Sequence, residues 1–240
     1  MFLSSFRAVP RKGHLEREKR IVGYLSKMKH GVIIFHTALP DYSDILEKIY
    51  DWEKSVYGST NEAKPHDAPI ALGKHIILTH YVDANIYHEM ITGRSVTDIL
   101  HFINQTPVDW FSKKQATCET ATYGSEFVAA RTCVEQIIDL RITLRYLGVP
   151  IIGPSYMFSS NDSVVNSSIL FCAKLHKRHI SLSFHRLRES IAANICRFYH
   201  IKGTANPADV LSKHWSYASA WPPLRPLMFW HGDTADISID

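Results

Sequence analysis

Hydrophobic and polar residues in the middle of the chain alternate with the period of two that is typical of β-strands. Over residues 75–83, Ile76, Leu78 and Val82 fall on one face, while Asp83 ends the other face. We therefore predict a half-buried strand that ends at an acidic residue. Two more strands are predicted over residues 95–103 and 108–113, joined by a turn over residues 104–107.

The hydrophobic period then changes to that of an α-helix, because apolar residues recur every three or four positions over residues 127–147. Gly148 and Pro150 are typical of the end of such a helix. The later predicted elements are a strand over 156–159, a helix over 182–193, a strand over 195–201 and a helix that begins at Asn206 and Pro207. This order predicts an α/β fold with a mixed five-stranded sheet and flanking helices.

The first 74 residues carry weaker signals. The apolar spacing predicts a helix over residues 14–29 and a short strand over residues 32–35. Prolines, glycines and scattered charges make residues 37–74 a predicted linker, with one helical turn over residues 45–52.

Composition and charge narrow the class of protein. Hydrophobic residues make up 45% of the 240 residues and charged residues 21%, as in ordinary globular proteins. No apolar run approaches the roughly 18 residues of a membrane-spanning helix. The N-terminus is too short and polar for a signal-peptide core, so we expect a cytoplasmic or nuclear protein that is not secreted.

The four cysteines form no Cys-x-x-Cys pair, which argues against a zinc ribbon. Residues 1–30 hold eight basic and two acidic side chains, which suits contact with phosphate or a solvated helix face.

Three acidic residues are placed where separate elements could converge. Asp83 ends the first predicted strand, Glu126 lies in the predicted first turn of the long helix, and Asp209 lies in that of the last helix. Taken singly, each is more often a helix-cap or surface acid. Together they have the oxygen chemistry that Mg²⁺ prefers, and a pair of such ions can cleave nucleic acid.

Several strings in this order resemble the ribonuclease H region of copia-type long-terminal-repeat retrotransposon polyproteins. The resemblance implies an RNase H-like domain over residues 75–215, with a C-terminal tail over residues 216–240. Residues 1–36 resemble the stretch that follows the reverse transcriptase palm. The strings are YVDAN at 81–85, TGRSVT at 92–97, VDWFSKKQ at 108–115, ATYGSEFVAA at 121–130 and IKGTANPADVLSK at 201–213.

By this resemblance, Asp83, Glu126 and Asp209 occupy three of four metal-binding positions. The cofactor implied is a pair of Mg²⁺ ions, with Mn²⁺ as an alternative. The family's fourth acid falls at Ser160, and the nearest acid, Asp162, comes two residues later. Asp162 could replace it only through a local bulge of the chain.

Two functions stay open at this point. One is a two-metal endonuclease that cuts the RNA strand of RNA–DNA hybrids, impaired by Ser160. The other is a catalytically inactive nucleic-acid-binding fold or a decayed retroelement relic. In either case the implied partners are the hybrid and the rest of the reverse transcriptase polyprotein, in the cytoplasm within a retroelement particle or in the nucleus. The candidate phosphate contacts are Lys113, Lys114, Arg131, Lys177 and Arg178.

Two other sites are disfavoured by the sequence. Tyr81-Val82-Asp83-Ala84 is similar to the strand turn of reverse transcriptases, but it lacks the second acid, so we expect no polymerase activity. His176 and His179 are three residues apart without a further metal-ligand pattern. We therefore predict solvent-facing or core histidines rather than a histidine metal site.

Overall fold

The computed structural model describes residues 9–27, 35–45, 50–86, 92–175 and 177–211. The helices are α1 (Lys12–Lys27), α2 (Thr122–Tyr146), α3 (Asp162–Ile169) and α4 (Ser181–Ala192). The strands are β1 (Leu78–Asn85), β2 (Val96–Ile103), β3 (Thr106–Lys114), β4 (Ser155–Ser159) and β5 (Cys196–His200). The 3₁₀ turns are η2 (Trp52–Lys54), η3 (Arg178–Ile180), η4 (Gly203–Ala205) and η5 (Pro207–Leu211).

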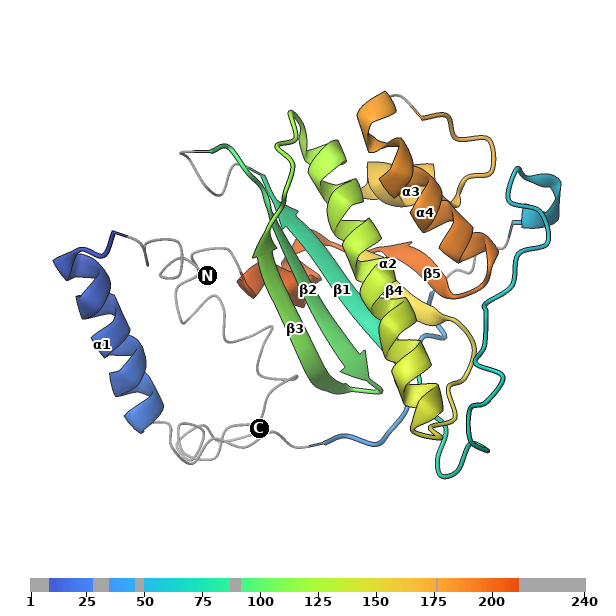
Figure 1. Cartoon of the computed structure of the whole chain (residues 1–240), viewed down its shortest axis with the longest axis horizontal. Helices are drawn as coiled ribbons and strands as arrows, with labels where there is room; N and C mark the ends of the chain where they lie inside the picture. Colours follow the sequence, from blue (N-terminus) through green and yellow to red (C-terminus); the bar gives the residue numbers. More distant parts are fainter. Residues whose placement is uncertain (1–8, 28–34, 46–49, 87–91, 176, 212–240) are drawn as a thin grey trace.

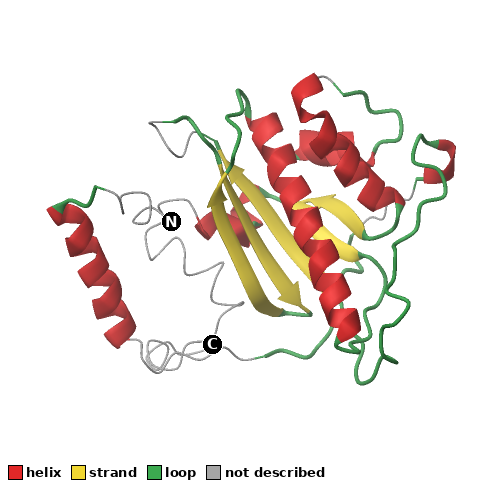
Figure 2. Cartoon of the chain, viewed as in Figure 1, coloured by secondary structure: helices red, strands yellow, loops and turns green. Residues whose placement is uncertain are grey.

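The five strands form one mixed sheet in the order β3-β2-β1-β4-β5. β1, β2 and β3 are antiparallel neighbours, and β4 and β5 are parallel additions on the other side of β1. The predicted α/β fold with a mixed five-stranded sheet and flanking helices is confirmed. Figure 2, in the same view as Figure 1, shows α2, α3 and α4 grouped beside the strands.

The turn between β2 and β3 is tighter than predicted. Asn104 has a φ of 55°, which lets two residues reverse the chain. Pro107 therefore belongs to β3 instead of the turn. It is tolerated there because β3 is an edge strand and the register shifts at this point.

Helix α2 crosses one face of the sheet (Figure 1) and supplies most of the core. Val82 and Ile99 pack with Phe127, Val134 and Ile137 in a single buried cluster. The helix ends as predicted, because Gly148 has a φ of 70° and its N–H bonds to the Arg145 carbonyl oxygen. α4 packs beside α2, and α3 contacts β5 and α4.

The predicted linker, residues 37–74, contacts the sheet and helices at several points. The Tyr42 hydroxyl lies 2.7 Å from the Thr79 hydroxyl, and its ring packs on Tyr156 at 4.5 Å between centroids. Further along, Glu62 forms ion pairs with Arg141 and Arg145 of α2. These contacts fasten the segment across the domain, while the domain boundaries themselves stay a prediction.

Some predicted elements reach beyond what the structure describes. The helix predicted over residues 14–29 appears as α1, whereas the strand predicted over 32–35 lies almost wholly outside the described residues. The last predicted helix is described only as the 3₁₀ turn η5. In the described part of the chain, no helix is long and apolar enough to cross a membrane.

Candidate active site

Two aspartates face each other at one end of the sheet. Val82 packs in the core under α2, so its neighbour Asp83 points to the opposite face of β1. Asp98 is the antiparallel partner of Asp83 on β2, and cross-strand partners share a face with Cβ atoms about 5 Å apart. Asp83 is 3% exposed and Asp98 is fully buried. Two carboxyl groups are therefore held side by side in a position shielded from water.

A third carboxyl group is brought to the same strands by the turn η5. Asn206 donates from Nδ2 to the carbonyl oxygen of Val82 over 3.0 Å, and its Oδ1 accepts from the Ala208 N–H over 3.1 Å. η5 contacts β1 and β2, and Asp209 in this turn is buried. In Figure 1 this orange-red turn lies on the side of the strands away from α2.

The fourth carboxyl group, that of Glu126, comes from α2. The helix begins at Thr122, so Glu126 is its fifth residue and lies just past the predicted first turn. Gln115 links this turn to the sheet, because its Nε2 donates to the Ser125 carbonyl oxygen over 2.8 Å and to the Thr97 hydroxyl over 3.0 Å. The residues that precede Glu126 and Asp98 are thus joined by one buried amide side chain.

Ser160, where the resemblance puts the family's fourth acid, directly follows β4. Val82 pairs with Ser159 in the parallel register of β1 and β4, so Ser160 follows at the level of Asp83. A Cβ atom on Gly203 would lie 3.8 Å from the Ser160 Cβ, which places the neutral serine next to η4.

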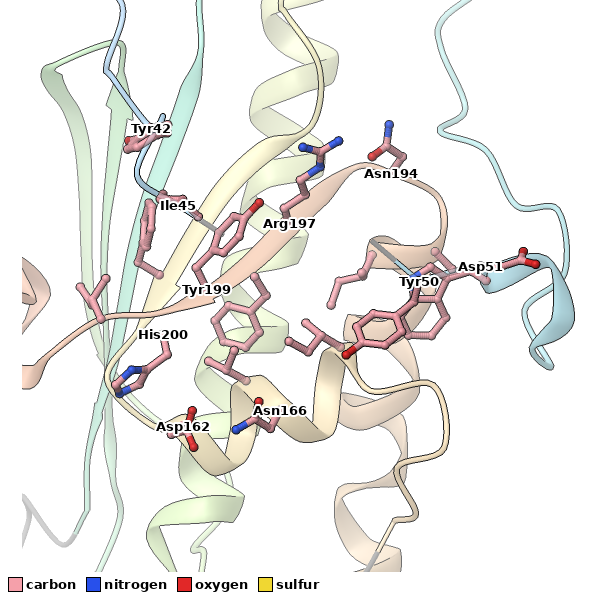
Figure 3. A pocket seen from close by; sticks show the side chains of 18 of the residues that line it. Tyr42, Ile45, Tyr50, Asp51, Asp162, Asn166, Asn194, Arg197, Tyr199 and His200 are labelled. Atoms are coloured by element: carbon pink, nitrogen blue, oxygen red, sulfur yellow. The ribbon is translucent and has the colours of Figure 1, made fainter. Parts of the chain in front are cut away.

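Asp162 does not follow Ser160 along a continued strand or through a bulge. Helix α3 starts at Asp162, and Asn161 caps it by accepting from the Val164 N–H over 3.2 Å. Asp162 is exposed and lines a groove together with Asn166 and His200 (Figure 3). Asp162 is therefore positioned by the first turn of α3, and not by the bulge that would have been needed for it to replace Ser160.

The groove in Figure 3 has a volume of ≈ 890 Å³ and runs along the edge strand β5. Its described lining includes Tyr42, Tyr81, Phe158, Tyr199 and Arg197. Among the described lining residues, none is one of the four buried acids on β1, β2, α2 and η5. The groove is therefore separate from the candidate active site.

The four acids suit a hard cation in chemistry but are not assembled into a binding group. Carboxylate oxygens are what Mg²⁺ prefers. Within the described ranges, no three His, Cys, Asp or Glu side chains are grouped closely enough to hold a metal ion. The donor set therefore fits the predicted cofactor by type, and Asp83, Glu126 and Asp209 are the predicted ligands.

The predicted phosphate contacts are spread over two regions. Lys113 and Lys114 pair with Thr97 and Val96, so they lie at the same end of the sheet as Asp98. Arg131 forms a 3.0 Å ion pair with Glu135 on α2, which offsets its charge. Two further cations belong to the segment before α4: Lys177 is half-buried, and Arg178 is exposed.

Asp98, Gln115 and Asn206 were not predicted as site residues. Asp98 interrupts the apolar run of β2, and a charged residue inside a strand that is buried on both faces is a usable signal. The two amides are detectable only through their tertiary hydrogen bonds.

Comparisons with known proteins find similarity to retroelement polyproteins, and no protein-family model matches the chain. The retrovirus-related Pol polyprotein from transposon TNT 1-94 of Nicotiana tabacum is 26% identical over 142 residues, which cover 59% of this chain and 10% of that polyprotein. The Pol polyprotein from transposon RE1 of Arabidopsis thaliana is 25% identical over 221 residues, which cover 88% of this chain and 12% of that polyprotein.

Among solved structures, LC11-RNase H1 from compost, in complex with an RNA/DNA hybrid, matches at 14% identity with a TM-score of 0.43. The match covers 56% of this chain and 92% of that one. The chain spans about a tenth of the length of the curated relatives it matches. Its relatives are retrovirus-related Pol polyproteins from plant transposons.

Proposed function

We propose that this domain binds RNA–DNA hybrids and cleaves their RNA strand with divalent metal ions, slowly because Ser160 replaces one acid. The observation that carries the proposal is the pairing of Asp83 with Asp98 beneath the turn that holds Asp209. Burying a carboxyl group is costly, and clusters of buried acids are found often at functional sites.

Asp83, Glu126 and Asp209 would hold the ions. Asp98 would add a carboxylate on the β2 side of Asp83, whereas Ser160 offers none on the β4 side. Bound Mg²⁺ would activate a water molecule and stabilise charge on the phosphoryl oxygens. Carboxylates repel one another in the absence of cations, so we expect these side chains to draw together only when metal binds.

The hybrid would be held through its phosphates. Lys113 and Lys114, at the acid end of the sheet, are the better-placed candidates, and Lys177, Arg178 and Arg131 are more remote ones. The rest of the polyprotein would supply further contacts, in a retroelement particle or in the nucleus.

A second function is favoured by one observation, the neutral Ser160 beside Asp83. In that case the domain binds the hybrid without cutting it. Both functions need binding, so the first test is the fluorescence anisotropy of a labelled hybrid at increasing salt. Affinity should fall about tenfold or more between about 50 and 200 mM salt, as expected when two or more counterions are released. Binding that does not change with salt, or equal binding of an uncharged-backbone analogue, would contradict both functions.

A further inference from the structure

A buried acid that is not one of the four acids of the candidate active site lies against the start of α2. The Glu119 side chain is 5% exposed, two residues before the N-cap Ala121. Its Oε2 accepts a hydrogen bond from His179 Nε2 over 2.9 Å. The Thr117 hydroxyl donates to Oε1 over 3.4 Å. Burying a carboxylate is unfavourable unless it gains partners, so this placement needs a reason.

The first turn of α2 leaves room for that carboxylate only because residue 124 is glycine. A Cβ atom at Gly124 would lie 2.4 Å from Glu119 Oε2, well inside van der Waals contact. Ala121 offers no side-chain cap to the helix. A negative charge at a helix N-terminus is favourable, so Glu119 supplies from the preceding loop what the cap residue lacks.

His179 connects this carboxylate to another helix. It belongs to η3, which leads directly into α4. Phe184 of α4 packs on Phe127 of α2 with ring centroids 5.8 Å apart. The hydrogen bond between His179 and Glu119 therefore joins the starts of α4 and α2, and Glu126 lies four residues after the first residue of α2.

We propose that Glu119 and His179 are positioning residues that hold the first turn of α2, and with it Glu126, against the sheet. The inference rests on the proposed function only for the role of Glu126. Its structural part, that the pair orders this turn, stands by itself.

The test compares His179→Ala, His179→Gln, Glu119→Gln and Gly124→Ala in the full chain. Amide hydrogen exchange is measured over residues 122–127, and kcat and KM are measured for cleavage of a labelled hybrid. His179→Ala should speed amide exchange in this turn by about tenfold, since the turn opens more often once the hydrogen bond between His179 and Glu119 is lost. kcat should fall with KM unchanged. His179→Gln keeps an N–H donor and should restore both values.

Gly124→Ala best separates a local effect on the helix from an effect of displacing Glu119. Alanine favours a helix over glycine, so a purely local effect would slow exchange. By displacing the Glu119 carboxylate, it should instead speed exchange, as His179→Ala does. Glu189→Gln, which breaks the exposed 3.1 Å ion pair with Arg186 on α4, is the matched control and should change neither value.

Unchanged exchange in His179→Ala and Glu119→Gln would overturn the inference. So would faster exchange with an unaltered kcat, because Glu126 would then not depend on the turn. A native chain that binds metal and hybrid but never cleaves would refute the proposed function alone, and the exchange measurement would still decide the structural claim.

Discussion

The Asn206 side chain donates a hydrogen bond to the carbonyl oxygen of Val82 over 3.0 Å and so ties η5 to β1 next to Asp83. These residues are 124 positions apart in the chain. The bond explains how Asp209, near the end of the described chain, reaches the strand that carries Asp83.

This bond can be separated from the helix cap by substitution. Asn206→Asp keeps the oxygen that accepts from Ala208 but loses the donor to Val82. We expect it to cost about 1–3 kcal/mol of unfolding free energy, since the buried Val82 carbonyl loses its side-chain partner. Urea unfolding measures this, with the exposed Asn61→Ala as control. A cost below that of the control would mean that the bond does not hold η5 in place.

Ser160→Asp should raise hybrid cleavage by on the order of 100-fold, because it returns an acid beside Asp83 and improves metal placement. Asp162→Ala should change cleavage little, since Asp162 begins α3 and faces the groove. Single-turnover cleavage of a labelled hybrid compares the two. Loss of activity in Asp162→Ala with none gained in Ser160→Asp would show that Asp162 is the ligand.

The sequence predicts a helix or strand well where the local pattern of residues decides its type and its end. Alternation identifies β1, and the helical period with Gly148 identifies the end of α2. Pro107 misleads because its place in an edge strand depends on which strand lies beside it. The pattern cannot reveal Asp98 as the partner of Asp83, since the register of two strands is a tertiary property.

The segment of residues 37–74 shows the same limit. Its prolines and charges predict a linker, yet its contacts depend on residues far away in the chain. The strings that contain Asp83, Glu126 and Asp209 can be recognised in the sequence because they resemble those of a known family. The amide bridges of Gln115 and Asn206 become visible only once the segments are packed.

Glu62 should be one of the more costly residues to change in that segment. Its carboxylate accepts from Arg141 Nε over 2.7 Å and also binds Arg145. Arg141 is 2% exposed, so Glu62→Gln leaves a buried cation without its counter-charge. We expect a loss of about 3 kcal/mol in unfolding free energy. The exposed pair of Arg186 and Glu189 is the control, and Glu189→Gln should cost less than about 1 kcal/mol. Equal costs would show that the segment is not fastened to α2.

Two buried histidines predict a fall in stability below neutral pH. His101 Nε2 lies 2.9 Å from Gln136 Oε1, which can only accept, so neutral His101 must accept from His80 at the 2.6 Å contact between their Nδ1 atoms. Burial, with the charges of His101 and Arg141, places the pKa of His80 well below 6.5, and burial also lowers the pKa of His101.

Because the unfolded chain binds these protons more readily, stability is full above about pH 6.5 and declines as the pH falls below it. Glu62 affects stability over a lower range of pH. Burial raises its pKa, but hydrogen bonds from Arg141 and Arg145 outweigh this and lower it to about 2. Its contribution is therefore present above about pH 4.5 and is lost toward pH 2. Urea midpoints at pH 7.5, 6 and 5 test the histidine effect. His80→Leu should flatten the dependence, and a native midpoint constant from pH 7.5 to 5 would contradict it.

The most direct test is Mg²⁺-dependent cleavage of an RNA–DNA hybrid, labelled on its RNA strand, by the native chain and by Asp83→Asn. Asp83 pairs with Asp98 and follows Val82, the residue to which Asn206 of the Asp209 segment is bonded, so its loss should remove metal placement without disturbing the core. We predict slow RNA cleavage by the native chain that requires Mg²⁺ or Mn²⁺ and falls by about 100-fold or more in a folded Asp83→Asn protein. Cleavage that persists unchanged in Asp83→Asn, or in the presence of a chelator, would contradict the account.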